Sequence, residues 1–180
     1  MDYWSPLIER CLALAARAEA AGDVPVGALI VDDDAPGPAP RIIAEAWNQR
    51  EDPTRPDPTA HAEILALRQA ALTCGDWHLT HHTLVVSLEP CLMCAGAILA
   101  ARIPRLVFAA WDDKAGACGS LRDVVRDPRN NHAVEVIGGV ESQAASSQLR
   151  AFFAAKRTSG RPLAPTKAHP LAEPACDNAE

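Results

Sequence analysis

Ser87-Leu-Glu-Pro-Cys-Leu-Met-Cys-Ala-Gly-Ala97 follows an apolar segment typical of a strand and leads into an apolar segment typical of a helix. Pro90 fits the first turn of that helix, where its missing N–H has no intrahelical partner. Cys91 and Cys94 are three residues apart, so the first helical turn places both thiols on one face, where they can bind one metal ion. The positive end of the helix dipole favours their thiolate forms. The stretch therefore predicts part of a zinc site.

The segment Pro58-Thr-Ala-His-Ala-Glu63 is the best candidate for the rest of that site. One neutral imidazole, from His61, and two thiolates neutralise Zn²⁺ and leave the fourth tetrahedral position for water. Coordination lowers the pKa of water from ~15.7 toward about 7, so that hydroxide becomes available at neutral pH. Glu63 lies close to His61 but points in a different direction. We therefore expect Glu63 to move protons and not to bind the metal.

A structural zinc site is the alternative for a Cys-x-x-Cys pair. Such a site needs a fourth protein ligand. The other four cysteines are scattered, and none lies at a paired spacing: Cys11, Cys74, Cys118 and Cys176. The pattern favours a catalytic site.

Length and composition indicate one domain, from residue 1 to residue 160, followed by a Pro- and Ala-rich tail, 161–180, that we expect to be disordered. The net charge of −6 argues against a protein that coats nucleic acid along its whole surface. The first residues do not resemble a signal peptide, and no run approaches the roughly 18 apolar residues of a membrane span. We expect no membrane association and a location in the reducing cytoplasm.

Helix and strand patterns alternate along the chain. Helices are predicted from Ser5 (N-cap) to about 21, from about 60 (N-cap Thr59) to 71, from 91 to about 102 and over 145–156; strands are predicted over 24–31, 41–47, 83–88, 106–110 and 134–137. A Pro-rich hairpin, 32–40, joins the first two strands. This order predicts a mixed sheet with helices on both faces. Both metal-binding segments begin helices at one sheet edge, where ligand sites cluster in open α/β sheets.

His61-x-Glu63 together with Pro90-Cys91-x-x-Cys94 matches the signature of zinc-dependent nucleobase deaminases. Longer stretches resemble the bacterial tRNA adenosine deaminases, in the same order over residues 5–158: Asp23-Val-Pro-Val-Gly27, Trp47-Asn48, Asp57 to Ile64, Ser87 to Ala97 and Gly119-Ser-Leu121. The chain departs from this family in the insert 33–40, in a longer loop over 48–58 and in its acidic net charge.

This resemblance implies a three-layer α/β/α cytidine-deaminase-like fold with a central mixed sheet of about five strands. It also implies a zinc-dependent hydrolase that converts adenosine to inosine at the wobble position of an arginine tRNA anticodon, with one Zn²⁺ per subunit of a homodimer. Hydroxide generated at the metal would attack C6 of the adenine. The uncharged helix from 92 to 101 fits a buried element at such a dimer interface.

The resemblance also assigns four substrate contacts. Asn48 would read the edge of the base, whereas Asp112, Lys114 and Asn131 would line the pocket or hold neighbouring nucleotides. From the residues alone, Asn48 could instead cap its own loop, and the other three are ordinary surface residues.

The segment from Glu141 to Lys167 carries five basic residues and one acidic residue. We expect this basic cluster to hold RNA phosphates, and Phe152 and Phe153 to pack inward.

Two other functions stay open at this stage. The first is a deaminase of a free base or nucleotide, of the guanine or cytosine type, on the same fold. The second is a non-catalytic binding module stabilised by zinc, which Glu63 and the missing fourth ligand disfavour.

Overall fold

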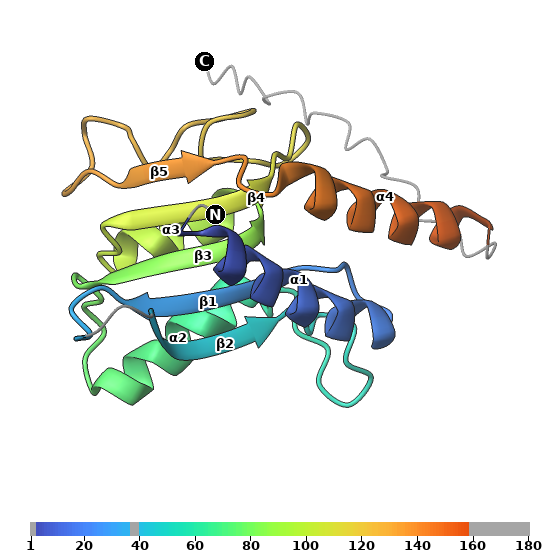
Figure 1. Cartoon of the computed structure of the whole chain (residues 1–180), viewed down its shortest axis with the longest axis horizontal. Coiled ribbons are helices and arrows are strands. Elements are labelled where there is room, and N and C mark those ends of the chain that lie inside the picture. Colours follow the sequence, from blue (N-terminus) through green and yellow to red (C-terminus); the bar gives the residue numbers. More distant parts are fainter. Residues whose placement is uncertain (1–2, 37–39, 159–180) are drawn as a thin grey trace, which may run out of the picture.

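The computed structural model describes residues 3–36 and 40–158. In chain order the elements are α1 (Ser5–Ala20), β1 (Gly27–Asp32), β2 (Arg41–Trp47), α2 (Ala62–Cys74), β3 (His82–Leu88), α3 (Leu92–Ala100), β4 (Arg105–Ala110), β5 (Glu135–Gly138) and α4 (Ser142–Thr158). Five strands form one sheet between two layers of helices (Figure 1). The predicted three-layer α/β architecture is confirmed. The tail 161–180 and part of the insert, 37–39, lie outside the described residues.

The strand order is β2-β1-β3-β4-β5. β1 is antiparallel to both of its neighbours, whereas β3, β4 and β5 run parallel. Parallel neighbours need a crossover, and α3 provides it between β3 and β4. The carboxyl ends of β3 and β4 therefore meet at one edge of the sheet, beside the first turn of α3.

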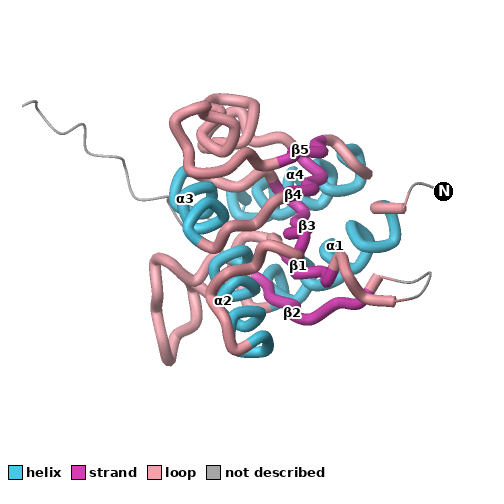
Figure 2. The backbone as a smooth tube through the Cα atoms, turned by 90° about the vertical axis from the view of Figure 1, so that its left-hand side faces the viewer, coloured by secondary structure: helices cyan, strands magenta, loops and turns pink. Residues whose placement is uncertain are grey.

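Two apolar cores cover the two faces of the sheet. Figure 2 shows α2 and α3 on one side of the strands and α1 on the other, where α4 also packs. Ile98 and Phe108 are fully buried in the first core, and Ile8 and Val85 in the second. Burying a side chain of this size contributes about 1.5–3 kcal/mol each. Because β3 is covered on both faces, its apolar run is nearly continuous.

The predicted helix starts are wrong by one or two residues. Trp4, not Ser5, is the N-cap of α1, and the Ser5 hydroxyl instead donates to Glu141 Oε1 at 2.8 Å. Thr59 donates to Asp57 Oδ1 through its N–H and its hydroxyl, both at 2.7 Å. This turn keeps the chain out of the helix until His61, which is the N-cap of α2.

Pro90 also lies outside the helix, since Cys91 is the N-cap of α3. The first strand begins at Gly27 and not at residue 24, because a tight turn joins Val26 N–H to Val24 O at 2.8 Å. In the part of the chain that the structure describes, no helix is both long and apolar enough to cross a bilayer.

Candidate active site

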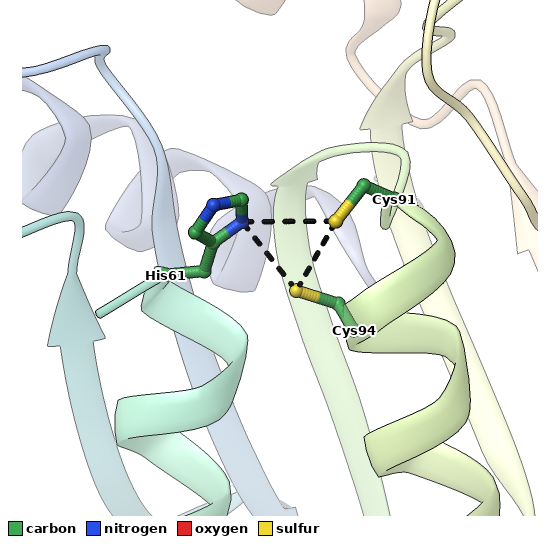
Figure 3. A group of neighbouring side chains, drawn as sticks. All are labelled: His61, Cys91 and Cys94. Atoms are coloured by element: carbon green, nitrogen blue, oxygen red, sulfur yellow. Dashed lines mark hydrogen bonds between the residues drawn. The ribbon is translucent and has the colours of Figure 1, made fainter. Parts of the chain in front are cut away.

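Two helix N-termini bring the three predicted ligands together. His61 and Cys91 are the N-caps of α2 and α3, both with extended backbone, and Cys94 lies in the first turn of α3. Figure 3 shows the imidazole pointing from α2 toward the two sulfurs on α3. The N–H groups and dipoles of both helices point at this place, which stabilises negatively charged thiolates.

The triangle of ligand atoms has the dimensions of a zinc site. His61 Nδ1 lies 3.8 Å from Cys91 Sγ and 3.6 Å from Cys94 Sγ, and the two sulfurs are 3.7 Å apart. Tetrahedral zinc with Zn–S of about 2.3 Å and Zn–N of about 2.0–2.1 Å requires edges of about 3.8 Å between sulfurs and about 3.6 Å from sulfur to nitrogen. Among the described residues, no fourth His, Cys, Asp or Glu joins the group. The residues present therefore fit a catalytic zinc ion.

The local electrostatics favour one thiolate even before metal binds. The hydrogen bond between the two sulfurs, followed by the one with His61, lowers the pKa of Cys91 to about 3. The hydrogen bond with Cys91 and burial raise the pKa of Cys94. Zinc binding at neutral pH therefore requires loss of the Cys94 proton, which a cation at this place promotes.

Glu63 lies on the first turn of α2, and its side chain is only 3% exposed. Burial raises the pKa of its carboxyl group. Oε2 is buried and has no hydrogen-bond partner among the described residues. A buried carboxylate oxygen without a partner is costly, and beside three metal ligands it is well placed to exchange protons with a bound molecule.

A cavity of about 120 Å³ opens over the triad. Its wall is formed by residues from both sides of the sheet edge: Val24, Val26, Asn48, Arg50, His61, Glu63, Leu88, Glu89, Cys91, Asp112 and Ala115. Asn48 is 4% exposed; its Oδ1 accepts from Ala62 N–H at 2.9 Å and its Nδ2 donates to Val24 O at 3.2 Å. Asn48 thus lines the cavity and also caps α2.

Of the other three predicted substrate contacts, only Asp112 lines the cavity. Its Oδ1 accepts the N–H groups of Lys114 and Ala115 at 3.0 and 3.2 Å. Lys114 is exposed and is not part of the cavity wall. Asn131 lies against Arg102 in a separate hollow of about 250 Å³. Contacts of Lys114 and Asn131 with neighbouring nucleotides stay predictions.

Sequence reasoning missed Glu89. This side chain is 2% exposed, and its two oxygens accept the N–H groups of Asp112, Cys118 and Ser120, each at 3.0 Å. Gly116 packs so closely on the carboxylate that a Cβ there would collide with Oε2. Because Glu89 directly precedes Pro90 and Cys91, it holds the loop after β4 beside the start of α3.

Sequence reasoning also missed Asp23, which plays a similar part on the opposite side of the cavity. Its carboxylate accepts N–H from Val24 at 2.7 Å, from Arg50 at 2.5 Å and from Glu51 at 3.1 Å, and it pairs with the Arg50 guanidinium at 3.2 Å. Both residues lie within motifs that the chain shares with the deaminase family, Asp23 to Gly27 and Ser87 to Ala97. Nothing in the sequence shows which backbone N–H groups they bind.

The end of α4 reaches the same side of the molecule. Lys156 Nζ donates to Gly22 O at 2.9 Å, next to Asp23. Phe152 is buried as predicted, but Phe153 is 40% exposed, so the prediction that both rings pack inward is wrong for Phe153.

Comparison with known proteins agrees with this chemistry. Residues 3–110 match the cytidine and deoxycytidylate deaminase zinc-binding region. A tRNA-specific adenosine deaminase of Haemophilus influenzae is 48% identical over 156 residues, which cover 87% of this chain and 86% of that protein.

Solved structures give two further matches. One comes from studies of A-to-I editing by tRNA:A34 deaminases at the wobble position of transfer RNA, with a TM-score of 0.70 and 37% identity, covering 78% of this chain and 96% of that one. The other is a guanine deaminase from Nitrosomonas europaea, with a TM-score of 0.65 and 30% identity, covering 82% of each chain.

Proposed function

The chain belongs to the cytidine and deoxycytidylate deaminase zinc-binding family, and we propose that it hydrolyses adenosine to inosine at the wobble position of a tRNA anticodon, in arginine tRNA. The single observation that carries this proposal is the zinc-sized triangle beside a buried, unpartnered glutamate oxygen. The similar tRNA-specific adenosine deaminase of Haemophilus influenzae supports the choice of substrate. A cytoplasmic location, as expected from the sequence, fits a tRNA substrate.

His61, Cys91 and Cys94 would hold the zinc ion, which lowers the pKa of a water molecule and so supplies a nucleophile at neutral pH. Glu63 takes a proton from the attacking water through Oε2. It passes this proton to the ring nitrogen as the water oxygen bonds to the carbon that carries the amino group. It then takes the second proton from the new hydroxyl group and gives it to the amino group, so that the C–N bond breaks, ammonia leaves and a carbonyl group forms. The burial of Glu63 supports this role, because Oε2 has no partner among the described residues and is free to bond the reacting groups.

The size of the cavity supports a single base as the reacting group. Its volume of about 120 Å³ is well below the ~300–1,000 Å³ of sites that enclose drug-sized ligands. A base that is turned out of an unpaired loop can enter such a space, while the rest of the RNA stays on the surface. The basic residues near the end of α4, Lys156 and Arg157, would hold phosphates there.

The test offers the zinc-loaded protein an anticodon stem-loop with adenosine at the wobble position, in parallel with free adenosine, guanine and cytosine. We expect inosine from the stem-loop and little product from the free compounds. The same stem-loop with guanosine at the wobble position is the matched control. Turnover of free guanine without turnover of the stem-loop would overturn the proposal and establish the second candidate, which the similarity to guanine deaminase of Nitrosomonas europaea favours.

We also propose a homodimer. α3 carries no charged side chain, yet Leu92 and Met93 at its start are 54% and 36% exposed. Leu121 adds a further exposed apolar side chain, at 50%. A second copy would cover such an apolar surface. Light scattering at micromolar concentration should give twice the chain mass, and a monomer mass would contradict the dimer without affecting the enzyme assignment.

A further inference from the structure

Trp111 is an exposed aromatic side chain that the proposed reaction does not use. It follows β4 directly and is 46% exposed, although tryptophan is usually largely buried in folded proteins. Its neighbour Asp112 lines the cavity over the metal triad. Trp111 is therefore the sequence neighbour of a residue that lines the cavity.

The indole of Trp111 packs against backbone at glycines, which have no side chain. A Cβ at Gly138 would come within 2.8 Å of Trp111 Cζ2, and one at Gly119 within 3.1 Å of Cζ3. A Cβ at Gly139 would lie 3.5 Å from Nε1. Gly138 and, less tightly, Gly119 therefore leave the space that the indole occupies, whereas a Cβ at Gly139 would only make an ordinary contact. Phe108 supports it from the core through an edge-on contact, with ring centroids 4.7 Å apart and an interplanar angle of 89°.

The backbone at Trp111 is fixed as well. The N–H of Asp112 donates to Glu89, and Gly139 N–H donates to Phe108 O at 2.9 Å. A ring held in this way loses little conformational freedom when it binds a ligand. Arg126 Nη2 would lie 3.2 Å from a Cβ at Gly119, so a guanidinium and the indole both border this glycine.

We propose that Trp111 is a stacking platform for the nucleobase next to the deaminated adenosine. The inference rests on the proposed function and deepens it, since it assigns a place to a second nucleotide. Aromatic rings with nearby cations are how proteins bind unpaired bases, because every base offers a flat face and every nucleotide a phosphate. Arg126, which also pairs with Asp123 at 2.8 Å, is available on its exposed side for that phosphate.

The experiment measures affinity for the wobble-adenosine stem-loop in a Glu63→Ala background, so that the RNA is not converted. The loop is offered intact or with an abasic site 5′ or 3′ to the target adenosine. With Trp111 present, one of the two abasic loops should bind about 5- to 100-fold more weakly than the intact loop. With Trp111→Leu, which keeps an apolar side chain on the glycines, that difference should disappear. Trp111→Phe should restore most of it.

Trp77 supplies the matched control. It is 57% exposed and lies between α2 and β3, at the opposite edge of the sheet, where it stacks on His78. Trp77→Leu should leave the abasic difference unchanged. Thermal unfolding of each variant separates loss of stacking from loss of fold.

The two proposals fail in different ways. If the protein with Glu63 and Trp111 in place deaminates the intact loop, but Trp111→Leu keeps the full abasic difference or no abasic site weakens binding, the stacking proposal is wrong and the function stands. If the intact loop is neither bound nor deaminated, the proposed function is wrong and the stacking proposal falls with it.

Discussion

On one side of the cavity the chain at Arg50 and Glu51 is attached to Asp23, and on the other side the loop from Asp112 to Ser120 is attached to Glu89. Each anchor is a carboxylate only 2% exposed, and each accepts three backbone N–H groups. The two sides of the cavity thus use the same arrangement.

The two carboxylates, of Asp23 and Glu89, differ in the groups that balance their negative charge. Asp23 pairs with the Arg50 guanidinium, whose side chain is 31% exposed, and one of its donors belongs to the exposed Glu51. Glu89 has no ion pair among the described residues and depends on backbone N–H groups, one of which belongs to the fully buried Cys118. Water can therefore partly replace the Asp23 contacts at Arg50 and Glu51, whereas the buried N–H group of Cys118 has no acceptor other than Glu89.

The largest effect on stability is expected from Glu89→Gln. The amide NH₂ must face at least one N–H donor, which leaves buried donors without an acceptor. We expect the free energy of unfolding to fall by about 3 kcal/mol, and kcat/KM to fall because the Asp112 wall of the cavity loses its position. Urea unfolding and steady-state kinetics measure these two changes. Zinc content near one per chain is the control, because no ligand is altered.

Asp23→Asn is the matched amide on the other side. We expect a smaller loss of stability, about 1–2 kcal/mol, because the released N–H groups and Arg50 can turn toward water. The two variants are compared in the same urea series. Equal losses for Glu89→Gln and Asp23→Asn would remove the distinction between the two walls.

Arg50→Ala separates the contribution of the ion pair to the Asp23 side from that of the backbone hydrogen bonds. It removes only the cation and leaves the three N–H donors to Asp23 in place. A partly exposed ion pair contributes about 1 kcal/mol or less, so this variant should lose the least stability of the three. Added salt should weaken the wild-type protein slightly more than the variant, because the other ion pairs are common to both. A loss larger than that of Asp23→Asn would show that the guanidinium, not the backbone, holds this wall.

The grouping of His61, Cys91 and Cys94 could be predicted from the sequence, because the two cysteines are one helix turn apart and His61 belongs to a short motif with Glu63. The anchors could not, because the partners of Glu89 are backbone groups 23 to 31 positions away and carry no residue identity. The helix starts at Thr59 and Pro90 were misplaced for a related reason. Local preferences favoured an N-cap at Thr59 and a place for Pro90 in the first helical turn. The turn at Asp57 instead delays α2 until its N-cap His61, and α3 begins only after its N-cap Cys91.

The mixed sheet followed from the order of elements, but the exposure of Phe153 and Trp111 did not. Aromatic side chains at such positions are assigned to the core by default, and only the packing of neighbouring elements shows which of them stay on the surface.

The central claim is that Glu63 moves protons beside a zinc ion held by His61, Cys91 and Cys94. Single-turnover deamination of the wobble-adenosine stem-loop by Glu63→Ala, at saturating protein and with zinc content determined on the same sample, tests it most directly. We expect one zinc per chain, unchanged RNA affinity and a rate reduced by ~10²–10⁴-fold or more, because a general acid–base group is lost. Deamination at the wild-type rate, or loss of zinc from this variant, would contradict it.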